Sequence, residues 1–81
     1  MNRIYRVLSH MDAPDGIHRV TIEESDGLFR FVAFTFISEV EIGEAHNYWR
    51  PICWSGLYRS AEDAERDARA EYPWLRHENS N

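Results

Sequence analysis

The stretch FRFVAFTF, at residues 29–36, restricts the possible folds of this chain more than any other feature. Its aromatic and β-branched residues are typical of a β-strand, in which alternate side chains point to opposite faces. One face then carries Phe29, Phe31, Ala33 and Thr35, and the other carries Arg30, Val32, Phe34 and Phe36. Because both faces are largely apolar, the strand needs a covering layer on each side.

The length of the chain limits how many layers it can supply. Its 81 residues correspond to one small domain. A domain of this size has a small core and a net stability of only a few kcal/mol. Hydrophobic residues make up 43% of the sequence, as in folded proteins. We expect a single domain over residues 1–75 and a frayed C-terminal tail over residues 76–81.

Charge and cysteine content narrow the cellular setting. The net charge is −5, which argues against a general affinity for nucleic acids or anionic membranes. The only cysteine is Cys53, so no intramolecular disulfide is expected, as in a reducing compartment. No apolar run has the length of a signal sequence or a transmembrane helix. The sequence therefore predicts a cytoplasmic protein with no membrane association.

Turn sequences divide the first half of the chain into three predicted strands. APDG, at residues 13–16, and SDG, at residues 25–27, combine the residue types that tight turns prefer. We expect strands over residues 3–11, 17–24 and 28–37. Short turns of this kind join neighbouring strands as antiparallel hairpins.

The second turn allows two strand registers. A two-residue loop would pair Ile22 with Phe31 and would place Glu23 opposite Arg30. A three-residue loop would instead oppose Ile22 to Arg30. We favour the two-residue loop because it matches an apolar residue with an apolar residue and an acid with a base.

The next part of the chain is predicted to hold a loop and a fourth strand. Residues 38–47, SEVEIGEAHN, are acidic and weakly patterned, which indicates a loop, with the alternative that the end of the third strand bends into it. Residues 48–58, YWRPICWSGLY, have the composition of a strand. Pro51 favours the edge of the sheet because proline has no N–H to donate to a ladder.

A helix is predicted from Ser60 to about Tyr72. Ser60 is a typical N-cap, and Asp63 follows three residues later, as in a capping box. Pro73 ends the helix, since the residue before a proline disfavours helical geometry. The residues that recur at helical spacing on one stripe are Ala64, Ala68, Tyr72 and Leu75.

These elements together predict an α+β fold, in the order β-β-β-β-α. A small antiparallel sheet of three to four strands is followed by one C-terminal helix packed on one face. The opposite face needs another cover, either residues 38–50 folded back over it or a partner chain. The candidate interface residues on that face are Val32, Phe34, Phe36, Trp49 and Trp54.

Reactive side chains show no recognised catalytic or metal-binding pattern. The four histidines and Cys53 lack the spacings of zinc sites and metalloproteases. A nucleophile pair of Cys53 and His46 is conceivable, but Cys53 has apolar neighbours, where cysteines are commonly inert. The acidic residues are expected on solvated edges, and no glycine-rich phosphate loop is present. The sequence therefore predicts no cofactor, no metal site and no catalytic residue.

The segment WSGLYRSAEDAERDARAEY, at residues 54–72, resembles the last strand and helix of the plant AP2 DNA-binding domain. Its aromatic-Gly-aromatic motif, followed by serine, glutamate and alanine, is also common in small bacterial domains. The resemblance implies a sheet followed by an alanine-rich helix. The basic, arginine- and tryptophan-rich first strands of that family are missing here. The resemblance therefore carries architecture, and no functional residue is transferred.

Three classes of function fit these features. The leading hypothesis is a small, non-enzymatic interaction module of bacterial type, which forms a homodimer or binds a protein partner through the apolar sheet face. The second is a nucleic-acid-binding sheet, which would require a locally basic face. Its candidate residues are Arg3, Arg19, Arg30 and Arg50. The third is a small-molecule-binding domain or enzyme subunit with a pocket between the sheet and residues 38–50.

Overall fold

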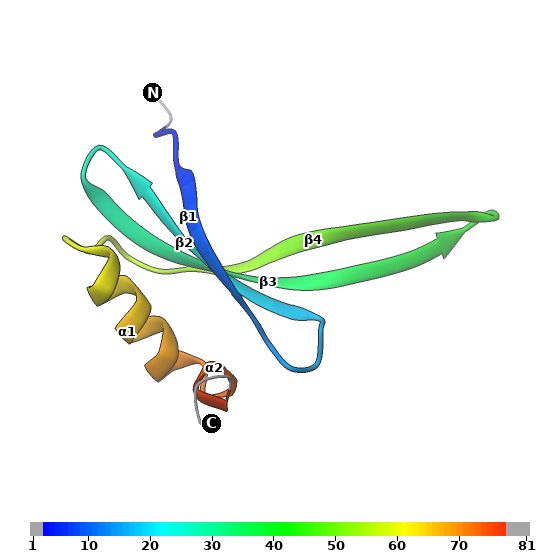
Figure 1. Cartoon of the computed structure of the whole chain (residues 1–81). Coiled ribbons are helices and arrows are strands. Elements are labelled where there is room, and N and C mark those ends of the chain that lie inside the picture. The colour runs from blue at the N-terminus through cyan, green and yellow to red at the C-terminus, as the bar shows by residue number, and fades with distance from the viewer. Residues whose placement is uncertain (1–2, 78–81) are drawn as a thin grey trace.

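The computed structural model describes residues 3–77 and shows a four-stranded antiparallel sheet followed by helices (Figure 1). The elements are β1 (Arg6–Asp12), β2 (His18–Ser25), β3 (Leu28–Glu41), β4 (Glu44–Trp54), α1 (Ala61–Glu71) and the short α2 (Trp74–His77). The strands lie side by side in chain order, so each pairs with the next. The predicted α+β fold is confirmed. Within the predicted tail, residues 76–77 belong to α2 and residues 78–81 lie outside the described part.

The hairpin between β2 and β3 has the predicted two-residue loop. Ile22 lies opposite Phe31, and Glu23 lies opposite Arg30. The loop residues have left-handed backbone angles, with φ of 51° at Asp26 and 78° at Gly27. Two successive left-handed residues match the natural twist of the flanking strands, and Asp-Gly is a preferred pair for this turn. Local turn chemistry therefore sets the register of the central strands.

The hairpin between β1 and β2 is less regular. Its loop spans residues 14–17, and the Ala13 N–H donates to the His18 carbonyl at 2.8 Å. The Asp15 carboxylate accepts hydrogen bonds within this loop, including one of 2.7 Å from the His18 ring, which lowers the Asp15 pKa. A bulge at Leu8 shifts the register of β1, and bulges are common in edge strands. β1 is shorter than the predicted strand over residues 3–11.

Residues 38–47 do not form the predicted loop. β3 and β4 run through this segment and meet at a two-residue turn, Ile42-Gly43. β2 pairs with β3 only as far as Thr35. The Phe36 N–H makes one more backbone hydrogen bond, to the Ile17 carbonyl. Beyond it β3 and β4 pair with each other and project from the body as a two-stranded ribbon (Figure 1). We call residues 36–49 the arm.

The arm makes the molecule extended. Its radius of gyration is 14.3 Å, whereas a compact domain of this length has a radius of gyration of about 12 Å. The principal extents are 46, 42 and 16 Å, so the protein is wide and thin. Of the two covers considered for the second apolar face, residues 38–50 folded back or a partner chain, the first does not occur, because these residues lie in β3, β4 and their turn.

After β4 the chain leaves the regular ladder. Residues 55–58 were predicted as strand, but they connect to the sheet only at isolated points: Ser55 exchanges hydrogen bonds of 3.0 and 2.8 Å with the Phe31 backbone, and Tyr58 forms a β-bridge with Phe29. It exchanges backbone hydrogen bonds of 2.7 and 2.9 Å with Phe29. β4 has a strand neighbour on one side only, so Pro51 lies in an edge strand, as predicted. The bridge at Tyr58 directs the chain into α1 beneath the sheet.

Helix α1 begins where its capping sequence predicts. The Ser60 hydroxyl accepts a hydrogen bond of 3.1 Å from the Asp63 N–H. Glu62 and Asp63 occupy the first turn, where negative charge complements the helix dipole. The helix ends at Tyr72, whose N–H donates to the Ala68 carbonyl. Pro73 then separates α1 from α2.

Loss of the cap should weaken the domain measurably. We expect Ser60→Ala to lower the free energy of unfolding by about 1 kcal/mol, because the Asp63 N–H loses its acceptor. Chemical denaturation of the two proteins measures the difference. Ser60→Asp provides the control, since aspartate is also a good N-cap and should retain the stability. Equal loss in both variants would contradict a capping role.

The core lies between the helices and one face of the sheet, which we call the first face. Its buried residues are Val20, Ile22, Phe31, Ala33, Ala64, Ala68 and Leu75. The two helical alanines are fully buried, and their small side chains allow α1 to lie close to the strands. The Phe31 ring contacts the rings of Tyr58 and Tyr72, each at 6.2 Å between centroids. The predicted helical stripe thus covers the first face.

Candidate interaction surface

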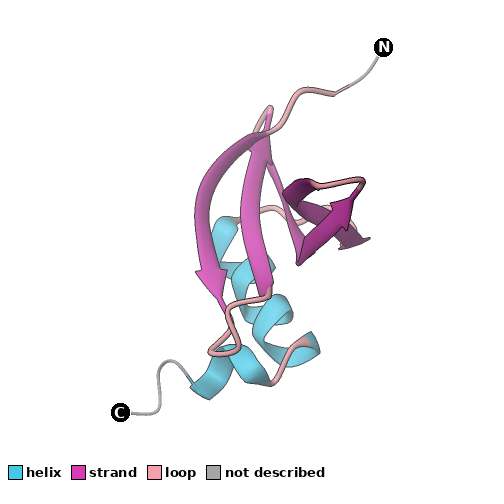
Figure 2. Cartoon of the chain, turned by 90° about the vertical axis from the view of Figure 1, so that its right-hand side faces the viewer, coloured by secondary structure: helices cyan, strands magenta, loops and turns pink. Residues whose placement is uncertain are grey.

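The face of the sheet opposite the helices is the candidate interaction surface, and we call it the second face. All five residues predicted for an interface lie on it, by strand alternation and register. Val32 lies opposite Trp54, and Phe36 lies opposite Trp49. Phe34 stands between these two pairs on β3. Both helices pack on the first face (Figures 1 and 2).

The five residues differ in the surface that they offer. Val32 is 1% exposed, although no helix among the described residues covers it. Its neighbours on the second face shield it, with Thr21 and Trp54 directly across the sheet. Phe34, Phe36 and Trp49 are half-buried, and Trp54 is 56% exposed. Val32 is therefore a buried packing residue of the second face, and the four aromatic residues form the accessible part of that face.

One end of the second face carries a buried ionic network built on the predicted Glu23–Arg30 pair, to which the structure adds contacts with Thr21 and Tyr5. The Glu23 carboxylate accepts hydrogen bonds from the Thr21 hydroxyl at 2.8 Å and from the Arg30 guanidinium at 2.9 Å. The Arg30 guanidinium also lies over the Tyr5 ring, 3.5 Å from its centroid. The polar residues on this part of the sheet are thus covered by side chains of the same chain.

A second stacked arginine lies nearer the arm. The Arg19 guanidinium lies 4.2 Å from the centroid of a Trp49 ring and donates a 2.6 Å hydrogen bond to the Asp12 carboxylate. This hydrogen bond lowers the pKa of Asp12, and the positive charge of Arg19 adds to the effect. Trp49 in turn contacts Phe36 edge-on, at 5.2 Å between centroids. Phe34, Phe36 and Trp49 form a row on the second face, which we call the aromatic row. The Asp12–Arg19 ion pair holds this row in place at Trp49.

The charge of the second face bears on nucleic-acid binding. Of the arginines predicted for that function, Arg19 and Arg30 lie on the second face, and each has a carboxylate at ion-pair distance. Arg50 lies opposite Thr35, on the other side of the sheet. A face that binds a phosphate backbone needs uncompensated positive charge. The face has paired charges instead, so no observation favours this function.

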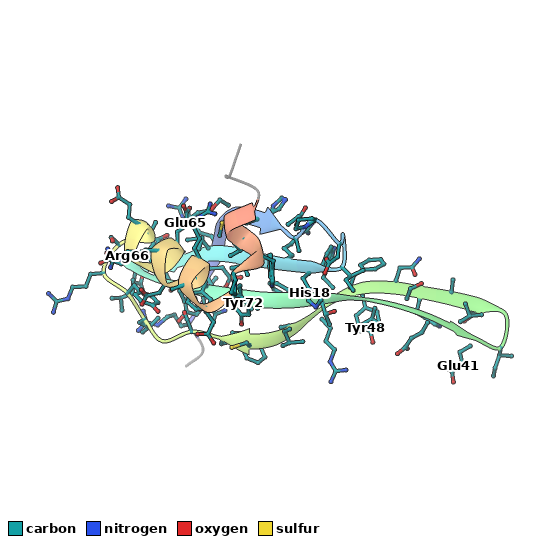
Figure 3. The ribbon with its side chains drawn as sticks, turned by 90° about the horizontal axis from the view of Figure 1, so that it is seen from below. His18, Glu41, Tyr48, Glu65, Arg66 and Tyr72 are labelled. Atoms are coloured by element: carbon teal, nitrogen blue, oxygen red, sulfur yellow. The ribbon has the colours of Figure 1, made fainter. Side chains whose placement is uncertain are left out.

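The arm has two chemically different sides. On the side continuous with the second face, Phe36 lies opposite Trp49, Ser38 opposite Asn47 and Val40 opposite Ala45. The other side carries Tyr48 and the acidic residues Glu39, Glu41 and Glu44. Tyr48 and Glu41 follow one another along the arm in Figure 3. The apolar side of the arm thus extends the second face outwards.

The turn at the end of the arm has a residue type that is unfavourable for its backbone conformation, unlike the Asp26-Gly27 turn. Ile42 has φ of 49° and Gly43 has φ of 81°, so both are left-handed, as in the Asp26-Gly27 turn. β-Branched residues rarely adopt this conformation, and the strain costs on the order of 1–3 kcal/mol. The Ile42 side chain is nevertheless 98% exposed. Nothing within the described chain supports it.

The small-molecule hypothesis placed a pocket between the sheet and residues 38–50, but these residues belong to β3, β4 and the turn between them and do not fold back over the sheet. A different hollow of about 360 Å³ lies between β1 and α1, where Leu8 and Ile22 meet Ala61. Glu65 and Arg66 on α1 line its rim, far from the arm (Figure 3). Its polar lining comes from Ser9 on β1 and from exposed or half-exposed side chains of α1.

The candidate nucleophile pair is not brought together. His46 lies on the arm, whereas Cys53 packs against the core beside Tyr72. Burial raises the pKa of the Tyr72 hydroxyl, and a hydrogen bond with Cys53 adds to the shift. Within residues 3–77, no three histidine, cysteine, aspartate or glutamate side chains gather as a metal site would require. The same residues contain no helix with the length and apolarity to cross a membrane.

No protein family, curated protein or solved structure matches this chain in sequence or fold comparisons.

Proposed function

We propose that this protein is a non-enzymatic interaction module that associates with a second copy of itself through the second face. One observation carries the proposal. The aromatic row of Phe34, Phe36 and Trp49 lies on a sheet face on which no helix packs within residues 3–77. Fully burying one such side chain stabilises by roughly 1.5–3 kcal/mol. Phe34, Phe36 and Trp49 are already half-buried, so a partner adds only the remaining part of this energy at each residue, summed over the row.

A second copy is the simplest cover for this row. In a two-fold dimer one patch meets itself, so a single apolar surface serves both subunits. The charges of the second face are paired, with Arg19 beside Asp12 and Arg30 beside Glu23. Two such faces therefore meet without the repulsion that the net charge of −5 would cause between unpaired surfaces.

Analytical ultracentrifugation over a range of concentrations tests the proposal. We expect a reversible monomer–dimer equilibrium, and Phe34→Glu should shift it strongly towards monomer, because the substitution places a charge in the apolar interface. Tyr48→Glu is the matched control: Tyr48 is an exposed aromatic residue on the other side of the arm. A strict monomer at all concentrations, or equal dimerisation of both variants, would refute self-association through this face.

A further inference from the structure

We propose that the two arms of the dimer pack face to face and antiparallel, about a two-fold axis that lies between the layers, midway between the Ser38–Asn47 pairs of the two copies. This inference rests on the proposed self-association and specifies how the two copies meet. The occupant of the arm's apolar side is the arm of a second copy.

The arm needs support from outside its own chain. The rest of the chain contacts the arm only at its base, where the Phe36 N–H donates to the Ile17 carbonyl at 2.8 Å and Arg19 lies over the Trp49 ring. Beyond this base the arm consists of two strands, with no third strand paired to it and no helix against it among the described residues. An isolated two-stranded hairpin is marginally stable in water, and stability requires a further strand or a packed layer. A second layer on the apolar side of the arm supplies what the chain itself lacks.

The side chains on the apolar side are graded in size along the arm. The base carries the bulky pair Phe36 and Trp49, and the end carries the small pair Val40 and Ala45. Between them lies a polar pair, in which the Ser38 hydroxyl is 2.9 Å from the Asn47 side-chain oxygen. A surface with bulky side chains at one end and small side chains at the other is complementary to a second copy that runs in the opposite direction.

A two-fold axis midway between the polar pairs of the two copies produces that fit. Residues equally far from Ser38, in opposite directions along β3, then face each other across the dimer. Val40 of one copy covers Phe36 of the other, and the two polar pairs meet at the centre, where their hydroxyl and amide groups are able to bond. Stacked sheets pack about 10 Å apart, with large side chains opposite small ones.

The same packing places Ile42, in the strained turn of one arm, in contact with the second copy. Ile42 is four residues from Ser38, so it reaches the position of the partner's Phe34, four residues on the other side of the axis. An exposed apolar side chain at the turn then becomes buried against an aromatic ring at the body of the partner. This contact accounts for an isoleucine at a left-handed position that favours asparagine, aspartate or glycine. The contact with the partner's Phe34 thus offsets the backbone strain at Ile42.

Chemical cross-linking tests the position of the axis. Ser38→Cys is made together with Cys53→Ser, so that position 38 carries the only thiol. The dimer is treated with a bis-maleimide chosen to span the spacing of stacked sheets, about 10 Å. We expect a covalent dimer. Glu39→Cys in the same background is the control, since residue 39 is equally exposed but faces away from the partner.

The outcomes separate this inference from the proposed function. A dimer in the ultracentrifuge that does not cross-link at position 38, or cross-links equally at position 39, overturns the arm packing and leaves self-association intact. A protein that is monomeric at every concentration overturns both. Strong cross-linking at position 38 alone supports both.

The strained turn offers a second readout. Asparagine tolerates left-handed angles, so Ile42→Asn should release backbone strain and raise the Tm of the dilute monomer by about 4 °C. The same substitution removes the contact with the partner's Phe34, so dimer formation should weaken at least tenfold. A higher Tm with unchanged dimerisation would show that Ile42 makes no contact across the interface.

Discussion

Phe31→Glu is expected to unfold the domain. Phe31 is 6% exposed and lies at the centre of the first face, between the rings of Tyr58 and Tyr72. Removing a buried phenylalanine costs about 3–5 kcal/mol, and a buried carboxylate without a partner adds to that cost. The sum reaches or exceeds the net stability expected of so small a domain. Far-UV circular dichroism should therefore show loss of α1 and no cooperative melting transition.

The neighbouring Phe34→Glu provides the matched comparison. Both substitutions place the same charge on β3, three residues apart, but Phe34 is half-buried on the second face. We expect Phe34→Glu to keep the helical signal and a cooperative transition. If both variants unfolded, the second face would be part of the folding core. A folded Phe31→Glu protein would refute the packing of α1 on the first face.

Arg30→Met should cause the second large loss of stability. The side chain of Glu23 is 9% exposed and that of Arg30 is 23% exposed, so the ion pair is largely withdrawn from water. Without Arg30, the buried Glu23 carboxylate retains only one of the two hydrogen bonds described above, the one from the Thr21 hydroxyl. Removing one partner of a buried pair costs about 3 kcal/mol or more. Chemical denaturation at neutral pH measures the loss.

Replacing both partners distinguishes an unpaired charge from lost packing. In Glu23→Leu/Arg30→Met the carboxylate is also removed, and apolar groups of similar volume take the place of the pair. We expect the double variant to recover most of the stability lost in Arg30→Met. A double variant as unstable as the single one would mean that Arg30 acts mainly by packing on Tyr5.

Local chemistry made the central part of the fold predictable. The Asp26-Gly27 pair is a preferred two-residue turn, so the register of Ile22 against Phe31 followed from turn length and side-chain matching. Ser60 and Pro73 marked both ends of α1 for equally local reasons. In each case the residue type and the backbone geometry agree, and the sequence alone was sufficient.

The arm could not be predicted on the same grounds. Its turn places Ile42 where a turn rule expects asparagine, aspartate or glycine, and its acidic residues suggested a loop. The alternation of Glu39, Val40, Glu41 and Ile42 was the available signal for a strand. The stacking of Arg30 on Tyr5 was also hidden, because it joins residues from β3 and from the segment before β1 that become neighbours only in the folded sheet.

The order of the elements along the chain has a consequence for synthesis. All four strands precede α1, and each strand pairs with its immediate predecessor, so the sheet is able to form by successive hairpin closure as the chain is made. Leu75, which is fully buried on the first face, is added only after the entire sheet. Until then both faces of β3 are open to water, and exposed apolar strands are prone to aggregate. The last helices to be synthesised therefore decide whether the nascent sheet stays soluble.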